Sequence, residues 1–165
     1  MDEVKIYLAS PFFNDKEREV KSKIMYALTL GGYTIIDPQE HEAGYDHKML
    51  WEMSCFSWGR QTFDKDARQI ENADVVVAID WGLYGDCGTA WEIGFAFAKG
   101  KPVIVIVPDE VLSVPHSLMI ANGSAHFVGQ SRFIEDIVPV YNLMDVTKYT
   151  DDTLRRYYLE GVPQK

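Results

Sequence analysis

The stretch ADVVVAID, residues 73–80, is apolar over almost its whole length and ends on an acidic residue. A run this short and this apolar is typical of a strand that is covered on both faces, as in a parallel sheet. A glycine-containing turn at 81–88 follows it, and then a helical pattern at 89–99, which we expect Gly100 to end. This order of strand, turn and helix predicts one unit of an α/β fold.

The same alternation extends along the chain in both directions. Further strands are predicted at 4–9, 33–37, 102–107 and 125–129, and further helices at about 14–30 and 61–72. The sequence therefore predicts an α/β domain with a parallel five-stranded sheet and helices on both faces. In such sheets, ligands bind beyond the carboxyl ends of the strands. That rule selects three turns as candidate parts of a site: 10–14, 81–88 and 108–119.

Composition limits the class of protein. The 165 residues suit one domain, 1–165, and a hydrophobic content of 47% can fill a single core. A net charge of −9 argues against nucleic-acid binding, which needs clustered Lys and Arg. No apolar run is long enough to cross a membrane, and the acidic N-terminus is unlike a signal peptide. Cys55 and Cys87 have no metal or redox spacing, so we expect reduced thiols in a cytoplasmic protein.

The predicted site turns lack the common phosphate-binding motifs. LASPFFND, residues 8–15, contains no glycine, so neither a dinucleotide fingerprint nor a nucleotide triphosphatase loop is present there. HEAGYDH, residues 41–47, has neither the spacing nor the helix of a zinc site, and no metal is expected. The turns instead offer aromatic rings and acids: Phe12, Phe13, Asp86 and Glu92. Such a pocket suits a flat, neutral heterocycle joined to a hydroxylated ring.

Four motifs stand in a fixed order along residues 4–120. They are KIYLASPFFN at 5–14, Asp66 ahead of an Ala-Asp pair at 73–74, D-x-G-T-A-W-E-x-G at 86–94, and Pro-x-x-Leu-Met at 115–119. In order and spacing, this set resembles the nucleoside 2-deoxyribosyltransferases. The resemblance implies a flavodoxin-like domain, no cofactor, and homo-oligomers, dimers or hexamers, whose subunits share active sites. It also implies a reaction that moves 2-deoxyribose between nucleobases, with 2′-deoxynucleosides and free bases as substrates.

Glu92 matches the nucleophile of that family. A carboxylate beneath the anomeric carbon can stabilise or attack the positive charge that develops when an N-glycosidic bond breaks. The helix N-terminus is expected to keep Glu92 ionised, and an apolar stripe toward the core is expected to leave it on a flank. The predicted stripe consists of Ala90, Ile93, Gly94, Phe97 and Ala98. The structural alternative is that Glu92 only stabilises the helix, through a favourable interaction of its charge with the helix dipole in the first turn.

Three more residues match functional positions of the family, and each has a structural alternative. Asp86 matches a residue that holds the 5′-hydroxyl of the sugar. Otherwise it caps the helix, and one side chain does not readily do both. Asp66 matches the acid that handles the proton of the departing base, or else it lies on a solvated helix face. Tyr7 matches a phenol that orients the nucleophile, although strand alternation could equally place it in the core.

Other residues are candidates for contacts with the base or the sugar. Phe13 and Trp58 could stack on the base, although single aromatic residues more often belong to the core. Gln39 could read the edge of the base through its paired donor and acceptor, or it could be an ordinary loop residue. The turns add further candidates for substrate contact: Ser10, Ser117 and Met119.

One position departs from the transferase pattern. The turn at 115–119 has Ser117 where these transferases usually carry Asn, and the related 2′-deoxynucleoside 5′-monophosphate N-hydrolases are similar to this sequence in having Ser there. Asp86 would repel a 5′-phosphate, which favours the transferase and leaves the hydrolase as the alternative. A non-catalytic nucleotide-binding module is a further alternative, although the nucleophile and its partner acids are all present. Residues 40–60 give no indication of purine or pyrimidine preference.

Overall fold

The fold is built on one parallel sheet of five strands in the order β2-β1-β3-β4-β5. The computed structural model describes residues 3–41 and 54–148. The strands are β1 (Lys5–Ala9), β2 (Thr34–Ile36), β3 (Val75–Ile79), β4 (Val103–Val107) and β5 (His126–Gly129). All five predicted strands are therefore confirmed, each shorter by one to three residues than its predicted run. This strand order is that of flavodoxin-like sheets.

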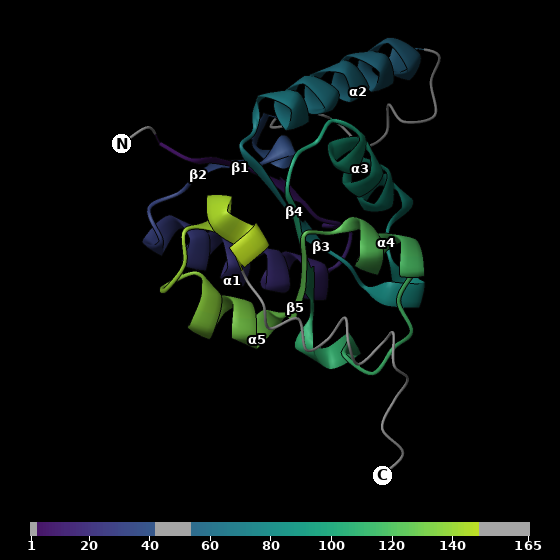
Figure 1. Cartoon of the computed structure of the whole chain (residues 1–165). Helices are drawn as coiled ribbons and strands as arrows, with labels where there is room; N and C mark the ends of the chain where they lie inside the picture. Colours follow the sequence, from purple (N-terminus) through teal and green to yellow (C-terminus); the bar gives the residue numbers. More distant parts are fainter. Residues whose placement is uncertain (1–2, 42–53, 149–165) are drawn as a thin grey trace.

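Helices cover both faces of the sheet, as predicted (Figure 1). They are α1 (Asp15–Leu30), α2 (Ser54–Asn72), α3 (Cys87–Ala98), α4 (Leu118–Gly123) and the short α5 (Gln130–Arg132). Helices α1 and α5 lie on one face, and α2, α3 and α4 lie on the other (Figure 1). Helix α2 begins well before the predicted residue 61. None of the helices in the described ranges is long and apolar enough to cross a membrane.

The start of α1 shows how the sequence sets an element boundary. Asn14 precedes the helix, and its side chain accepts a hydrogen bond from the Glu17 amide at 3.0 Å. The Glu17 carboxylate in turn accepts a hydrogen bond from the backbone amide of Asn14 at 3.3 Å. This reciprocal capping satisfies amide groups that would otherwise lack partners at the start of a helix. The predicted cap at Asn14 is therefore confirmed, and it fixes where the first turn of the site ends.

The order of the strands creates the place for a site. Strand β1 leads into α1 on one face, whereas β3 leads into α3 on the other face. Because the two connections leave the sheet in opposite directions, a crevice opens at the carboxyl ends of these neighbouring strands. Strands β3 and β4 are buried over their whole length, which is why their sequences are apolar without alternation.

The predicted apolar stripe of α3 is wrong. The helix buries Thr89, Ile93 and Ala96, whereas Phe97 is 63% exposed. The Thr89 hydroxyl is bound at 3.1 Å by Asp86, so this polar residue can face inward without losing a hydrogen bond. The buried stripe is therefore rotated from the predicted one, and Glu92 lies on its border, facing β1, which agrees with the flank position expected for it.

Candidate active site

A cavity of about 130 Å³ lies at the carboxyl ends of β1, β2 and β3. Its walls come from the turn after β1, the short 3₁₀ helix Pro38–His41 after β2, helix α2, and the start of α3. The lining residues are Ser10, Pro11, Phe12, Phe13, Pro38, Gln39, Asp66, Asp86, Gly88, Thr89 and Glu92. Six of the residues predicted from the sequence are thus brought into one cavity, from segments that are distant along the chain.

A larger cavity, of about 500 Å³, lies between α1 and α5 on the other face of the sheet. Its walls carry mainly apolar side chains, such as Leu30 and Ile134, and one of its two acids, Asp109, accepts a hydrogen bond from the hydroxyl of Ser131. The smaller cavity is the better candidate for a reaction because three acids and a buried phenol converge there.

The contact between Tyr7 and Glu92 is the centre of the site. The Tyr7 hydroxyl, on β1, donates a hydrogen bond of 2.5 Å to Oε1 of Glu92 on α3. Tyr7 is fully buried, so it is both a core residue and a partner of the carboxylate. Burial, followed by the charge of Glu92, raises the pKa of Tyr7. The phenol therefore stays protonated and donates, which fixes one carboxylate oxygen and leaves Oε2 for other contacts.

The expectation that Glu92 is held fully ionised is wrong. Burial raises its pKa from 4.5 to about 7, against the lowering effect of the Tyr7 hydrogen bond. The charges of Asp66 and Asp86 raise the pKa further. A helix dipole contributes only about 0.3–1 kcal/mol at such a position, whereas desolvation of a buried carboxylate costs more. Near neutral pH, Glu92 is consequently a mixture of carboxylate and acid.

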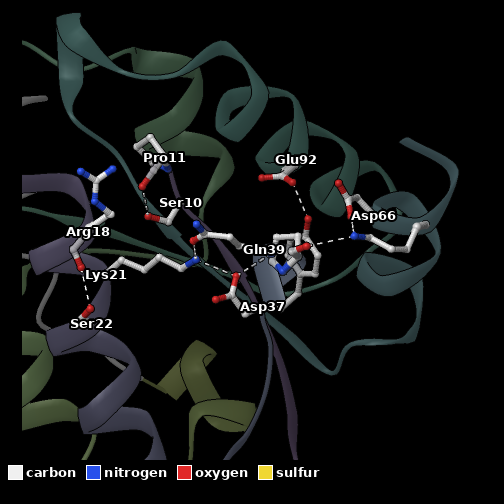
Figure 2. A network of polar contacts seen from close by, with 12 residues as sticks. Ser10, Pro11, Arg18, Lys21, Ser22, Asp37, Gln39, Asp66 and Glu92 are labelled. Atoms are coloured by element: carbon white, nitrogen blue, oxygen red, sulfur yellow. Dashed lines mark hydrogen bonds and ion pairs between the residues drawn. The ribbon is translucent and has the colours of Figure 1, made fainter. Parts of the chain in front are cut away.

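Asp66 faces the site from α2. Its side chain is only 19% exposed, which contradicts the alternative of a solvated helix face. Its Oδ1 lies 3.4 Å from Nζ of Lys65, and its charge raises the pKa of both Tyr7 and Glu92. Figure 2 shows Asp66 and Glu92 on neighbouring helices above the same part of the sheet. Asp66 is thus close enough for its charge to act on the nucleophile candidate.

Asp86 is the N-cap of α3, so its structural alternative is confirmed. Its Oδ2 accepts from the Thr89 amide at 2.7 Å and from the Thr89 hydroxyl at 3.1 Å. Asp86 nevertheless also lines the cavity. The expected conflict between capping the helix and binding the sugar does not arise. Because a carboxylate has two oxygens and the cap uses only Oδ2, Oδ1 stays available for a ligand.

The turn after β1 supplies the open wall of the cavity. The hydroxyl of Ser10 donates to the Pro11 carbonyl at 2.8 Å. Phe13 is 69% exposed and stacks on Phe12, with ring centroids 5.0 Å apart. An exposed ring at the mouth of a cavity is available to stack on a flat ligand, so the core alternative for Phe13 is wrong.

Two predicted site residues, Ser117 and Met119, are not brought into the cavity. Met119 is 83% exposed, and Ser117 caps α4 through a 3.3 Å bond from the Met119 amide. No side chain of the third predicted turn, 108–119, lines the cavity. The side chain of Trp58 lies outside the described residues. Within those residues, no cluster of His, Cys, Asp and Glu side chains could hold a metal ion.

Sequence reasoning missed a buried ion pair beside the cavity. Lys21 of α1 and Asp37, just after β2, are 5% and 6% exposed, and their charged atoms lie 2.8 Å apart. Asp37 could have been found, since it follows a predicted strand at the carboxyl edge of the sheet. Lys21 could not, because a lysine in a helical pattern is normally solvated.

Comparison with known proteins agrees with this geometry. The family described as nucleoside 2-deoxyribosyltransferase matches residues 6–144. The chain is 24% identical over 140 residues to the nucleoside deoxyribosyltransferase of Lactobacillus leichmannii, covering 77% of this chain and 85% of that protein. It is 33% identical over 110 residues to a Thermofilum pendens protein named provisionally as a 2′-deoxynucleoside 5′-phosphate N-hydrolase, covering 66% and 71% of the two chains.

A solved structure gives the same result. The 2-deoxyribosyltransferase of Bacillus psychrosaccharolyticus superposes with a TM-score of 0.67 at 29% sequence identity, over 87% of this chain and 96% of that one. The ordered motifs and the sheet therefore have one common explanation. This chain belongs to the nucleoside 2-deoxyribosyltransferase family and is an enzyme of that type.

Proposed function

We propose that this enzyme transfers 2-deoxyribose between nucleobases through a covalent ester on Glu92. The family supports an activity of the deoxyribosyltransferase or N-hydrolase type. The observation that carries the finer proposal is the partly buried Glu92 carboxylate, held by Tyr7 at 2.5 Å. A carboxylate that is oriented and only weakly solvated is well prepared to attack an electron-poor carbon.

In the first step, Oε2 of Glu92 attacks the anomeric carbon of a 2′-deoxynucleoside as the bond from that carbon to the base nitrogen breaks. The bonding pair leaves with the base, and Asp66 delivers a proton to it. Tyr7 holds Oε1, so the attacking oxygen keeps its direction. The positive charge on the sugar is stabilised by the same carboxylate, as in retaining glycosidases.

In the second step, a nitrogen of the incoming base attacks the anomeric carbon and Glu92 leaves as a carboxylate. Asp66 takes back a proton from the incoming base, so that each residue ends in its starting state. Attack by water in place of the base would release free deoxyribose. Transfer therefore depends on a base occupying the cavity before water does.

Incubation with 2′-deoxyinosine, with and without adenine, tests the proposal. We expect 2′-deoxyadenosine to appear only when adenine is present, and chromatography of the products would detect it. Inosine serves as a control and should react poorly, because a 2′-hydroxyl makes the charged transition state harder to reach. Free deoxyribose without a new nucleoside would indicate a hydrolase instead, and no turnover would indicate a binding module.

The N-hydrolase is a second candidate, and one observation favours it. Ser117 stands where Asn is usual in the transferases, and the Thermofilum pendens relative is 33% identical. Against it stands the carboxylate of Asp86 in the cavity wall, since a phosphate dianion beside it would be repelled. We therefore place the unphosphorylated 5′-hydroxyl at Asp86.

The proposal includes a cytoplasmic homo-oligomer that serves the salvage of deoxynucleosides. Leu118 and Met119, at the start of α4, are 61% and 83% exposed. Large apolar side chains exposed together suit a contact between subunits. Ser117 directly precedes them, so such a contact would carry it toward the cavity of a neighbouring subunit. The activity per subunit should then decrease when dilution makes the oligomer dissociate.

Replacing Tyr7 with Phe should shift the pH dependence of the enzyme. The Tyr7 hydrogen bond lowers the pKa of Glu92, so its loss raises that pKa above about 7. Because the attacking form is the carboxylate, kcat/KM rises as pH increases through the pKa of Glu92. The acidic limb of the profile should therefore move to higher pH in Tyr7→Phe, with about a tenfold loss near pH 6.

The matched control is Tyr33→Phe, which removes a phenol bonded at 3.2 Å to the Tyr141 carbonyl, away from the cavity. In that variant, the acidic limb of the pH profile of kcat/KM should stay where it is in the wild type. An acidic limb that is also unchanged in Tyr7→Phe would show that Tyr7 does not act on Glu92.

A further inference from the structure

The buried ion pair beside the cavity holds Gln39 in one orientation. Nζ of Lys21 donates to Oδ1 of Asp37 at 2.8 Å and to Oε1 of Gln39 at 2.8 Å (Figure 2). Asp37 Oδ1 also accepts from the Gln39 backbone amide at 3.0 Å. Both the backbone and the side chain of Gln39 are therefore bound to the same pair of charges.

The chemistry of lysine decides which end of the amide faces it. An ammonium group has only donors, so it binds the oxygen of the Gln39 amide and not the nitrogen. Rotating the amide by half a turn would set two donors against each other and lose a charge-assisted bond. We expect this to disfavour the rotated form by roughly tenfold to a hundredfold. The Nε2 end of Gln39 consequently points away from Lys21.

A second lysine holds the same turn from the other face of the sheet. Nζ of Lys65, on α2, donates to the Pro38 carbonyl at 3.0 Å and lies 3.4 Å from Asp66. Lys21 comes from α1, so the segment 37–39 is held between two helices on opposite faces of the sheet (Figures 1 and 2). A turn fixed in this way can discriminate between ligands, because it does not rearrange to suit each one.

We propose that Lys21 is a positioning residue for base selection: it makes Gln39 a donor only, so the enzyme prefers bases that present an oxygen over bases that present an amino group. This inference rests on the proposed function, in which the sugar lies at Glu92 and Asp86 and the base lies toward Gln39 in the same cavity. A site built to donate rejects an amino group because two donors then face each other unpaired.

The test compares substrates that differ in one group: 2′-deoxyinosine with 2′-deoxyadenosine, and 2′-deoxyuridine with 2′-deoxycytidine. The ratio of kcat/KM for the oxo and amino members is measured in each pair. Gln39→Met lacks the side-chain amide, so its oxo-to-amino ratio reflects only the different leaving-group chemistry of the two bases. We expect the ratio in the wild type to be about tenfold higher than in Gln39→Met for at least one substrate pair.

Lys21→Met should bring the ratio close to that of Gln39→Met, because the freed amide can turn either end toward the base. In the Gln39→Met background, Lys21→Met should leave the ratio unchanged, which a merely structural role of Lys21 would not require. Lys23→Met is the matched control, since Lys23 lies on the same helix and pairs with exposed Glu19. It should retain the wild-type ratio.

Lys21→Met leaves Asp37 buried without its cation, so a variant that keeps the ion pair is needed as well. Gln39→Glu offers one carboxylate oxygen to Lys21 and the other, an acceptor, to the base. We expect it to invert the selectivity toward the amino member. If transfer activity is present, two results would overturn the inference. One is an equal oxo-to-amino ratio of kcat/KM in wild type and Gln39→Met, and the other is a Gln39→Glu variant that does not prefer the amino substrate. A wild type inactive on all four nucleosides would overturn the proposed function and the inference with it.

Discussion

Glu92→Gln should lose at least roughly a thousandfold in transfer activity and yet be more stable than the wild type at pH 8. The amide cannot attack the anomeric carbon, but it still offers an oxygen to the Tyr7 hydroxyl. Activity loss with a stabilised fold is typical of a residue kept for chemistry at the expense of stability.

The expected stabilisation follows from the pKa of Glu92. Its pKa is about 7 in the folded protein and near 4.5 in the unfolded chain, so the folded state disfavours the carboxylate. Stability therefore decreases as pH rises from about 4.5 through 7, and the full cost is present above pH 7. With about 1.4 kcal/mol for each pKa unit, the cost reaches up to about 3 kcal/mol. Glu92→Gln should recover much of it at pH 8 and little at pH 4.5.

Urea unfolding of both proteins at the two pH values measures this difference. Glu71→Gln is the matched control, because Glu71 is an exposed partner of Lys99 at 2.6 Å and lies outside the cavity lining. It should change neither activity nor the pH dependence of stability. A folded Glu92→Gln enzyme with near-normal activity would reject Glu92 as the nucleophile. A mass increase matching one deoxyribose on the wild type, absent from the variant, would support the covalent route.

The second large effect concerns the 5′ end of the substrate. The wild type should prefer a 2′-deoxynucleoside over its 5′-monophosphate by about a hundredfold, because the monophosphate loses a charge-assisted bond to Asp86 and adds repulsion. Asp86→Asn removes the charge and should reduce the preference for the nucleoside over its 5′-monophosphate, mainly by lowering kcat/KM for the nucleoside. The measurement is kcat/KM for 2′-deoxyadenosine and its 5′-monophosphate in both proteins.

The fold should tolerate this substitution. The amide oxygen of Asn can accept the bond from the Thr89 amide that Asp86 now accepts at 2.7 Å, and Asn is as good an N-cap as Asp. The unfolding free energy should therefore change by less than about 0.5 kcal/mol. A wild type that prefers the monophosphate would contradict the transferase proposal and favour the N-hydrolase.

Local sequence was sufficient to predict the five strands, helices α1 and α3, and candidate site residues, whereas it placed the start of α2 too late and did not predict α4 or α5. The apolar runs at 75–79 and 103–107 were typical of buried parallel strands, and the Asn14–Glu17 pair specified the start of α1. The ordered motifs contain five of the predicted residues that the cavity brings together, and the sixth, Gln39, was predicted from its position after the second strand. The strand runs and the helix start depend on residues that are neighbours in the chain, and the meeting of the motif residues depends on the strand order. Sequence patterns indicate both.

The electrostatic state of the site could not be read in this way. Glu92 and Tyr7 are 85 positions apart, and the pKa of Glu92 depends on how much water the packing of α2, α3 and β1 excludes from its carboxylate. The buried face of α3 and the burial of Lys21 depend in the same way on segments that meet only after folding. Sequence thus determined which groups are present and roughly where they lie. Only the tertiary structure decided their solvation and orientation, because desolvation is a property of all the atoms packed around a group.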